Sequence, residues 1–238
     1  MSEPPGERTM GAVERAADVE FFFDPVCPFA WITSRWVTRV AALRDLRIEW
    51  RLICLRIVNE QRDYATLPEG YRSHHERGTR LLRIAAAARD RHGPEILGPL
   101  YTAYGEAMWH VGPAAESARS IFDQVADDPA VMGPLLQRVG VDPDLAAASR
   151  DERWDAVLRT ETEVALGRTG SEVGTPVITY APPDGPSLFG PVISRIPDDD
   201  EALVLWDAVT TLARFPGFAE LKRSMRDPID LPRLRRRD

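Results

Sequence analysis

The sequence predicts an α/β fold in which a long helical segment is inserted into a small β-sheet. The apolar run at residues 19–23, broken only by Glu20, is typical of a strand in the middle of a sheet. Residues 70–168 then show helical patterning, and strand character returns only at residues 177–180 and 187–192. The sheet is therefore expected to combine the two ends of the chain.

Length and composition favour a globular protein without nucleic-acid or membrane partners. The chain has 238 residues, of which 44% are hydrophobic, so it can bury a sizeable core in one domain or in one domain with an insertion. The net charge of −7 argues against general nucleic-acid binding, and a solvated end is the simpler interpretation of the arginine-rich tail, residues 233–237. No apolar run approaches the ~18 residues that cross a bilayer, and residues 1–19 lack the apolar core of a signal peptide. We therefore expect a cytoplasmic protein.

The first predicted unit is a strand, a helix and a second strand. Apolar residues recur at three- and four-residue intervals between Pro28 and Leu43, as in a helix with one buried face. Proline is well tolerated in the first turn of a helix, so Pro28 marks its start. Residues 48–55 are predicted to form the second strand. The predicted helices of the inserted segment are Tyr71–Arg91, Pro94–Trp109, Ala115–Val125, Ala130–Gly140, Asp144–Arg150 and Glu152–Gly167.

The last predicted unit is a hairpin followed by a helix. Residues 181–186, with the sequence Ala-Pro-Pro-Asp-Gly-Pro, are typical of a hairpin loop. The final helix is predicted from Asp198 to Phe215, because the acids at residues 198–200 suit a helix N-terminus. This order predicts a thioredoxin-like fold with a large all-helical insertion, the arrangement of DsbA-like and kappa-transferase-like proteins. The expected parts are a flexible arm (1–17), the thioredoxin-like domain (18–69 and 169–225), the helical insertion (70–168) and a C-terminal tail (226–238).

Cys27 is the candidate catalytic residue. It precedes the predicted helix start at Pro28, where unpaired backbone N–H groups and the helix dipole stabilise a thiolate. A free thiol with a pKa of about 8.5 is only a few per cent ionised at pH 7. A lowered pKa would therefore make Cys27 a nucleophile. The alternative is a buried cysteine that packs as a small apolar side chain.

A second signal is Gly174-Thr175-Pro176, directly before a predicted strand. A proline at this place can form a cis peptide bond in a loop that faces the reactive thiol, although only about one X–Pro bond in twenty is cis. Such a loop exposes the backbone of Thr175 to a thiol substrate. The position between the insertion and the third strand favours this interpretation.

Ala30 determines which mechanisms are open to Cys27. A dithiol enzyme resolves its mixed disulfide with the second cysteine of a Cys-X-X-Cys motif, and here that position holds Ala30. Cys27 could exchange with a disulfide and be released by an external thiol, or pass through a sulfenic acid. Cys54 could act as the resolving thiol only if its Cα lies within about 7 Å of that of Cys27. Packing is the alternative role of Cys54.

Several motifs resemble the mycothiol-dependent nitroreductase family, a cytoplasmic, DsbA-like branch of the thioredoxin superfamily. They occur in order through nearly the whole chain after residue 18. The matching stretches are FFDPVCPFAWITSRW (22–36), VNEQRD (58–63), LPEGYR (67–72), PLYTA (99–103), VGTP (173–176), FGPV (189–192) and FAELKR (218–223). The family pattern has Cys-Pro-Trp-Cys, whereas this chain has Phe29 and Ala30 in the last two positions.

The resemblance implies thiol–disulfide exchange linked to mycothiol, with nitroreduction of small aromatic compounds for some members. Mycothiol, or another low-molecular-weight thiol, would then be a co-substrate, and no cofactor would be tightly bound. Cys27 would be the nucleophile, and the residues expected to bind the substrate or thiol are Pro28, Phe29, Thr175, Pro176, Asn59 and Tyr71. For the last two, a loop cap (Asn59) and a packed aromatic (Tyr71) are equally simple interpretations. Ala30 excludes ordinary dithiol cycling.

Residues 23–30 also resemble the Asp-x-x-Ser-Pro-Tyr-Ala pattern of kappa-class glutathione transferases and 2-hydroxychromene-2-carboxylate isomerases. In that branch a serine orients the thiolate of a bound thiol, so no resolving cysteine is needed. Three hypotheses follow: a monothiol oxidoreductase, a transferase or isomerase in which a bound thiol is the nucleophile, and a non-catalytic binder. A homodimer is plausible. The histidines show no metal-binding pattern, since His74 and His75 diverge by about 100° on a helix and His92 and His110 stand apart.

Overall fold

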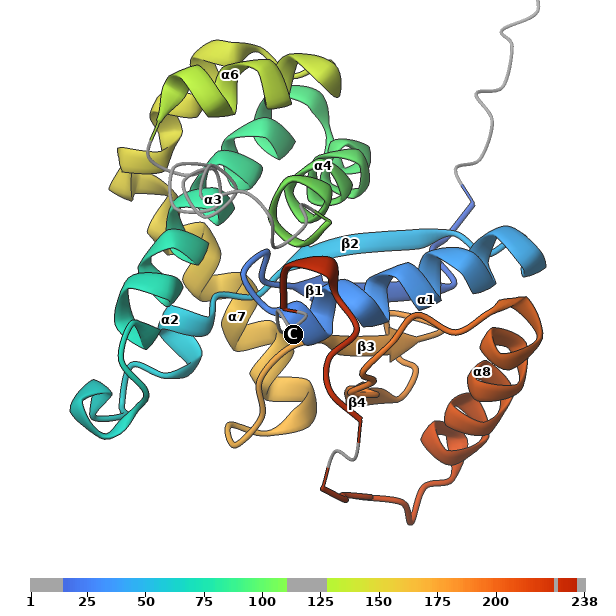
Figure 1. Cartoon of the computed structure of the whole chain (residues 1–238). Coiled ribbons are helices and arrows are strands. Elements are labelled where there is room, and N and C mark those ends of the chain that lie inside the picture. The colour runs from blue at the N-terminus through green and yellow to red at the C-terminus, as the bar shows by residue number, and fades with distance from the viewer. Residues whose placement is uncertain (1–14, 111–127, 225–226, 235–238) are drawn as a thin grey trace, which may run out of the picture.

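The computed structural model describes residues 15–110, 128–224 and 227–234, and the sheet at its centre has four strands. The strands are β1 (Val19–Phe23), β2 (Ile48–Leu52), β3 (Val177–Tyr180) and β4 (Ser187–Phe189), in the order β2-β1-β3-β4. β1 runs parallel to β2 and antiparallel to β3, which pairs with β4 as a hairpin. Both ends of the sequence thus contribute to one sheet (Figure 1).

The apolar run of β1 follows from burial of both faces of the strand. Side chains alternate between the faces of a strand. Phe21 and Phe23 belong to the main core with α1 (Pro28–Arg44), whereas Phe22 packs with Ala165 of α7 (Asp155–Thr169). α8 (Asp199–Arg214) adds to the α1 side, where Trp36 Nε1 donates to Ala202 O at 3.0 Å. The central strand therefore has no solvent-facing side.

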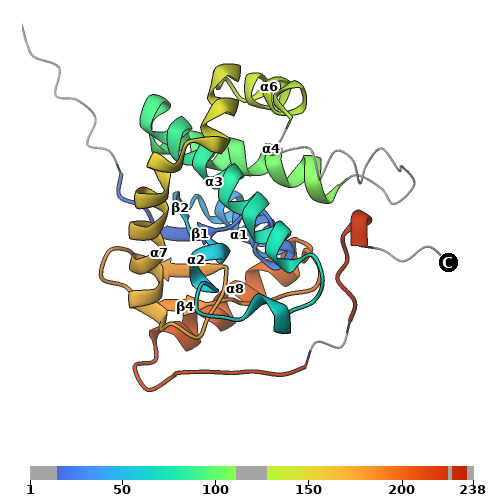
Figure 2. The same cartoon turned by 90° about the vertical axis from the view of Figure 1, so that its left-hand side faces the viewer.

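The segment between β2 and β3 is helical in the part that the structure describes. Its elements are α2 (Leu55–Val58), η1 (Tyr64–Thr66), α3 (Tyr71–His92), η2 (Pro94–Ile96), α4 (Leu97–Trp109), α6 (Pro129–Arg138), η3 (Pro143–Arg150), η4 (Glu152–Trp154) and α7, where η denotes a 3-10 helix. Figure 2 shows α3, α4 and α6 grouped on one side of the sheet. The predicted helix Ala115–Val125 lies outside the described residues. The predicted domain boundaries stay predictions.

Five predicted elements differ from the structure, among them the helix predicted from Glu152, whose residues 152–154 are 3-10 helical. The strand expected over residues 48–55 ends at Leu52. Ile53 N still donates to Phe23 O at 3.2 Å, but the N–H groups after it bond to side chains: Cys54 N donates to Thr162 Oγ1 and Leu55 N to Asp24 Oδ2. The strand expected over 187–192 ends at Phe189, since Pro191 has no N–H for the ladder. Residues 94–96 and 143–150 are 3-10 rather than α-helical; short apolar patterns do not separate periods of 3.0 and 3.6.

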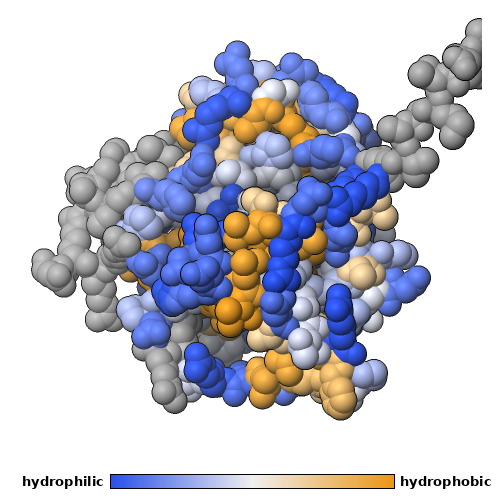
Figure 3. Space-filling view, turned by 90° about the vertical axis from the view of Figure 1, so that its right-hand side faces the viewer, coloured by the Kyte–Doolittle hydropathy of each residue, from blue (hydrophilic) through white to orange (hydrophobic). Residues whose placement is uncertain are grey.

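The C-terminal part begins with α8, whose N-terminus has a capping box between Asp198 and Glu201. On the side of the molecule that carries α8, apolar and hydrophilic side chains lie in adjacent strips (Figure 3). Val204, Leu212 and Phe215 are exposed in this region. The expected homodimer stays a prediction. Among the described helices, none is sufficiently long and apolar to cross a bilayer.

Candidate functional site

The turn between β1 and α1 presents the thiol of Cys27. Cys27 is the N-cap of α1, and Pro28 occupies the first turn of the helix. The Cys27 sulfur accepts a hydrogen bond from Ala30 N at 3.4 Å, and its S–H donates to Thr175 O at 3.5 Å. The backbone of Cys27 also takes part in the first turn of the helix, because Trp31 N donates to Cys27 O at 3.1 Å. The thiol is thus held between a helix N-terminus and the loop before β3.

The loop that faces Cys27 is the predicted Thr175-Pro176 segment. The peptide bond between these residues is cis. Thr175 is buried, and its Oγ1 donates to Phe22 O of β1 at 3.1 Å. This bond fixes the loop to the strand that leads into Cys27. Cys27 and Thr175, which are 148 positions apart in the sequence, are therefore in contact through the Cys27 sulfur.

Burial gives Cys27 a pKa opposite to the one expected. Only 7% of the residue is exposed, and burial raises the pKa of its thiol to about 12. The hydrogen bond from Ala30 N lowers the pKa but does not outweigh burial, and the charge of Asp24 raises it further. The predicted lowering of the Cys27 pKa by the helix N-terminus is therefore wrong. In these buried surroundings the thiol is neutral at pH 7.

Asp24 is a buried carboxyl group beside this turn that was not selected from the sequence. Its Oδ1 accepts from Val26 N at 3.1 Å and its Oδ2 from Leu55 N at 2.8 Å. Gly78 of α3 lies against it, since a Cβ there would come within 2.7 Å of Oδ1. Burial raises the pKa of Asp24 to about 7. The sequence feature that could have identified Asp24 is its position directly after an apolar strand.

Two helices of the inserted segment reach the same turn. From α3, His74 Nε2 lies 2.8 Å from Val26 O, and burial lowers the pKa of His74. From α4, Trp109 Nε1 donates to Pro25 O at 3.4 Å. Next to it, Trp31 Nε1 of α1 lies 3.3 Å from His110 Nε2. The backbone before Cys27 is therefore held from both the sheet and the helical side.

The remaining predicted binding residues have different surroundings. Pro28 and Phe29 are partly buried in the first turn of α1, beside Cys27. Asn59 is the C-cap of α2, where its Nδ2 donates to Leu55 O at 2.8 Å. Tyr71 begins α3, is 44% exposed, and its ring packs edge-on against His75 at 5.2 Å. Asn59 thus has a capping role in its own helix, while Tyr71 offers an accessible aromatic face.

Cys54 is fully buried, and both cysteines are free thiols. Its sulfur lies 3.4 Å from Thr79 Oγ1 of α3, and burial raises its pKa to about 11. These surroundings match the packing interpretation of Cys54. A resolving role stays a prediction.

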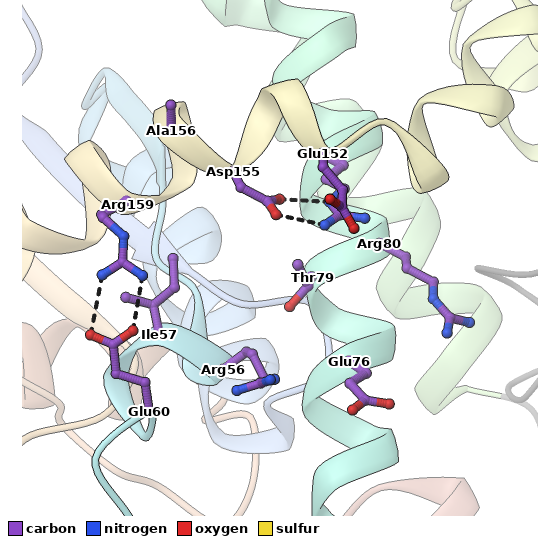
Figure 4. A pocket seen from close by; sticks show the side chains of 11 residues that line it. Arg56, Ile57, Glu60, Glu76, Thr79, Arg80, Glu152, Asp155, Ala156 and Arg159 are labelled. Atoms are coloured by element: carbon purple, nitrogen blue, oxygen red, sulfur yellow. Dashed lines mark hydrogen bonds and ion pairs between the residues drawn. The ribbon is translucent and has the colours of Figure 1, made fainter.

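Thr79 also lines a charged cleft of about 720 Å³ between α2, α3 and α7 (Figure 4). Two bidentate ion pairs span it: Arg159 with Glu60, and Arg83 with Asp155. Four cationic and four anionic side chains line the cleft: Arg56, Arg80, Arg83, Arg159, Glu60, Glu76, Glu152 and Asp155. Its charges balance, so the cleft does not select an anion. Within the described ranges, no group of three or more His, Cys, Asp or Glu residues is placed to hold a metal ion.

One family model and one curated relative match most of this chain. Residues 26–223 match the model of a family described as Rv2466c-like, mycothiol-dependent nitroreductase Rv2466c. The uncharacterized protein Rv2286c of Mycobacterium tuberculosis is 34% identical over 218 residues, which cover 90% of this chain and 84% of the relative.

Two solved structures are similar in outline. A 2-hydroxychromene-2-carboxylate isomerase aligns with a TM-score of 0.49 and 17% identity, over 82% of this chain and 96% of the other. A structure described as a probable DsbA oxidoreductase, SCO1869, from Streptomyces coelicolor aligns with a TM-score of 0.48 and 15% identity, over 87% and 93%.

Proposed function

This chain belongs to the Rv2466c-like family of mycothiol-dependent nitroreductases, and from that membership we propose that it is an oxidoreductase that works through the single thiol of Cys27. The observation that carries the proposal is the environment of one sulfur atom. Cys27 Sγ lies between Ala30 N and Thr175 O, and the residue one helical turn beyond it is alanine rather than cysteine. The proposed compartment is the cytoplasm, where free thiols persist.

The proposed reaction is a pair of thiol–disulfide exchanges. The Cys27 thiolate attacks one sulfur of a disulfide, a Cys27–S bond forms, the original S–S bond breaks, and the other half leaves as a thiolate. An external thiolate then attacks the mixed disulfide at the captured sulfur, which forms a new disulfide and restores the Cys27 thiolate. Mycothiol is the proposed external thiol, by family membership. No second protein cysteine is consumed, so Ala30 is compatible with turnover.

The surroundings of Cys27 suit this sequence of steps. The amide of Ala30 already points at the sulfur and would stabilise the thiolate once the site is open. The captured half would lie against Thr175 and Pro176, with Pro28 and Phe29 beside it and Asn59 and Tyr71 further out. While the thiol stays buried, its raised pKa keeps it neutral and therefore a poor nucleophile. The proposal therefore requires the Cys27 thiol to lose its proton as the substrate binds.

The test uses one-cysteine variants and the intact mass of the protein. Incubation with mycothiol disulfide should add one mycothiol to the wild type and to Cys54→Ala, and none to Cys27→Ser. Added mycothiol should then remove the adduct and release the disulfide. A Cys27→Ser variant that still acquires the adduct, or a wild type that never does, would refute the proposal.

The raised pKa favours one alternative, in which Cys27 stays a neutral thiol. Its S–H would then turn from Thr175 O toward the thiolate of a bound mycothiol, and that thiolate would attack the electrophile. This is the role of the serine in the kappa-class pattern. A hydroxyl can donate the same hydrogen bond, so Cys27→Ser should keep substantial activity and Cys27→Ala should lose it. The monothiol mechanism requires both variants to be inactive.

A further inference from the structure

The C-terminal segment, residues 227–234, runs from the loop after β4 to α4. Beyond α8 the chain returns toward the helical side, and in Figure 1 this red segment runs in front of α1 to the level of α4. It ends in a short 3-10 helix, η5 (Pro232–Leu234), which packs against α4. Figure 2 shows the same segment at the edge of the molecule, beside the end of α4.

One end of the segment is attached to the loop after β4. Asp230 N donates to Ser194 O at 2.7 Å. Three residues before Ser194, the carbonyl of Pro191 accepts a hydrogen bond from Thr33 Oγ1 of α1 at 2.8 Å. The segment is therefore tied to the side of the site formed by α1 and the β4 loop.

The other end is attached to the helical side. Leu231 is 1% exposed and belongs to the main core, and η5, which follows it directly, packs against α4. Arg233 lies near enough to His74 for its charge to lower the pKa of that histidine, after the larger effect of burial. His74 in turn contacts Val26 O, directly before Cys27. The segment thus spans from the β4 loop to α3 and α4, the helices whose His74 and Trp109 contact the backbone directly before Cys27.

We propose that residues 227–234 form the outer wall of the Cys27 site and limit by size the molecules that reach the thiol. The inference rests on the proposed role of Cys27 as the reacting group. In this segment Leu231 is fully buried and Ile229 is partly buried, whereas its other residues are partly or fully exposed. A segment with so few apolar anchors opens at a lower free energy than the core. Small, extended thiols and electrophiles are therefore admitted, and folded proteins are excluded as disulfide partners.

The experiment compares two full-length variants and two alkylating probes. Leu231→Ala removes the anchor of the wall, and Leu136→Ala removes a fully buried leucine of α6 as the matched control. Iodoacetamide is the small probe, and a maleimide on a polyethylene glycol chain is the bulky one. Peptide mass spectrometry assigns the label to Cys27 over time.

For each protein we compare the labelling rate of Cys27 with the bulky probe to its labelling rate with the small probe. In Leu231→Ala this ratio should be about tenfold or more higher than in the wild type, because the loss of a core contact favours local opening. Leu136→Ala should leave that ratio unchanged. An unchanged ratio in Leu231→Ala refutes the wall. An equal rise in both variants also refutes it, because labelling would then reflect general unfolding. Alkylation requires no turnover, so these outcomes are separate from the mycothiol-adduct test of the proposed function.

Discussion

Two buried carboxyl groups in this molecule have opposite surroundings. Glu161 of α7 bonds to Arg51 Nε at 3.0 Å, to Arg89 Nη1 at 2.8 Å and to Leu52 N at 3.1 Å. Among the residues that the structure describes, the hydrogen-bond donors to the Asp24 carboxyl group are the backbone N–H groups of Val26 and Leu55. Both lie next to the sheet, one under α7 and the other at the thiol turn.

The pKa values show what this difference does. Burial raises the pKa of Glu161, but the hydrogen bond with Arg51 and the charges of Arg89 and Arg51 outweigh it, so the pKa is lowered overall. For Asp24, burial outweighs the two backbone hydrogen bonds, and the pKa rises to about 7. A buried acid is stable as an anion only where cations are provided. The paired site therefore contributes to stability, and the unpaired one can respond to pH near neutrality.

The largest effect is expected from neutralising the paired acid. Glu161→Gln removes the carboxylate that pairs with both Arg89 and Arg51. Arg51 keeps Glu20 as an ion-pair partner at 2.8 Å, whereas the partly buried Arg89 loses the counter-charge of Glu161, so the free energy of unfolding should fall by about 3–5 kcal/mol. Urea unfolding followed by circular dichroism at pH 7 measures it. Glu60→Gln is the matched control, because the pair of Glu60 with Arg159 is exposed and should contribute little. Equal losses of unfolding free energy in the two variants would contradict the view that the buried pair stabilises the fold more than the exposed one.

The unpaired acid should instead destabilise the fold as the pH rises. The pKa of Asp24 is raised from 3.8 to about 7 on folding, so the folded state holds the proton more tightly than the unfolded chain. The stability contribution of the protonated group is fully present below pH 4 and is lost as the pH rises through 7. Between pH 4 and pH 8 the free energy of unfolding of the wild type should therefore fall, relative to that of Asp24→Asn, by at most about 4 kcal/mol.

Urea unfolding of both proteins at intervals from pH 4 to pH 8 gives the difference directly. A difference that does not change with pH would mean that Asp24 is ionised in the folded state throughout. Asp24 would then resemble Glu161, and the comparison would lose its basis.

A smaller effect tests how closely α3 packs on Asp24. In Gly78→Ala the new Cβ would lie 2.7 Å from Asp24 Oδ1 and 2.9 Å from Val26 Cγ2, so stability should fall by about 1–3 kcal/mol. Gly167→Ala in α7 meets nothing within 4 Å and should raise stability by about 0.5–1 kcal/mol, because alanine favours the helix. Thermal unfolding of the two variants compares them. A Gly78→Ala variant as stable as the wild type would show that α3 is free to shift away from the turn.

The sequence predicted the parts of this site that depend on local order. The apolar strand, the proline in the first helical turn and Gly174-Thr175-Pro176 before a strand were each visible as short patterns, and their order predicted the thioredoxin-like fold. The burial of Cys27 could not be predicted in the same way. It depends on His74, Trp109 and Thr175, which reach the turn from α3, α4 and the loop before β3, and no local pattern specifies how these elements pack together. The backbone N–H groups at the start of α1 do lower the pKa of Cys27, but desolvation, which only the packed structure reveals, has the larger effect.

The smallest expected effect joins the unpaired acid to the chemistry of the thiol. The charge of Asp24 raises the pKa of Cys27, after burial and against the hydrogen bond from Ala30. Asp24→Asn removes that charge, so the alkylation rate of Cys27 at pH 8 should rise by roughly two- to tenfold, equivalent to a pKa change of up to about one unit. Below pH 7 the wild-type carboxyl carries a proton, so the two proteins should converge. A rate ratio that is constant from pH 6 to pH 9 would instead indicate a change in access to the thiol, because an electrostatic effect of Asp24 must titrate with its carboxyl group.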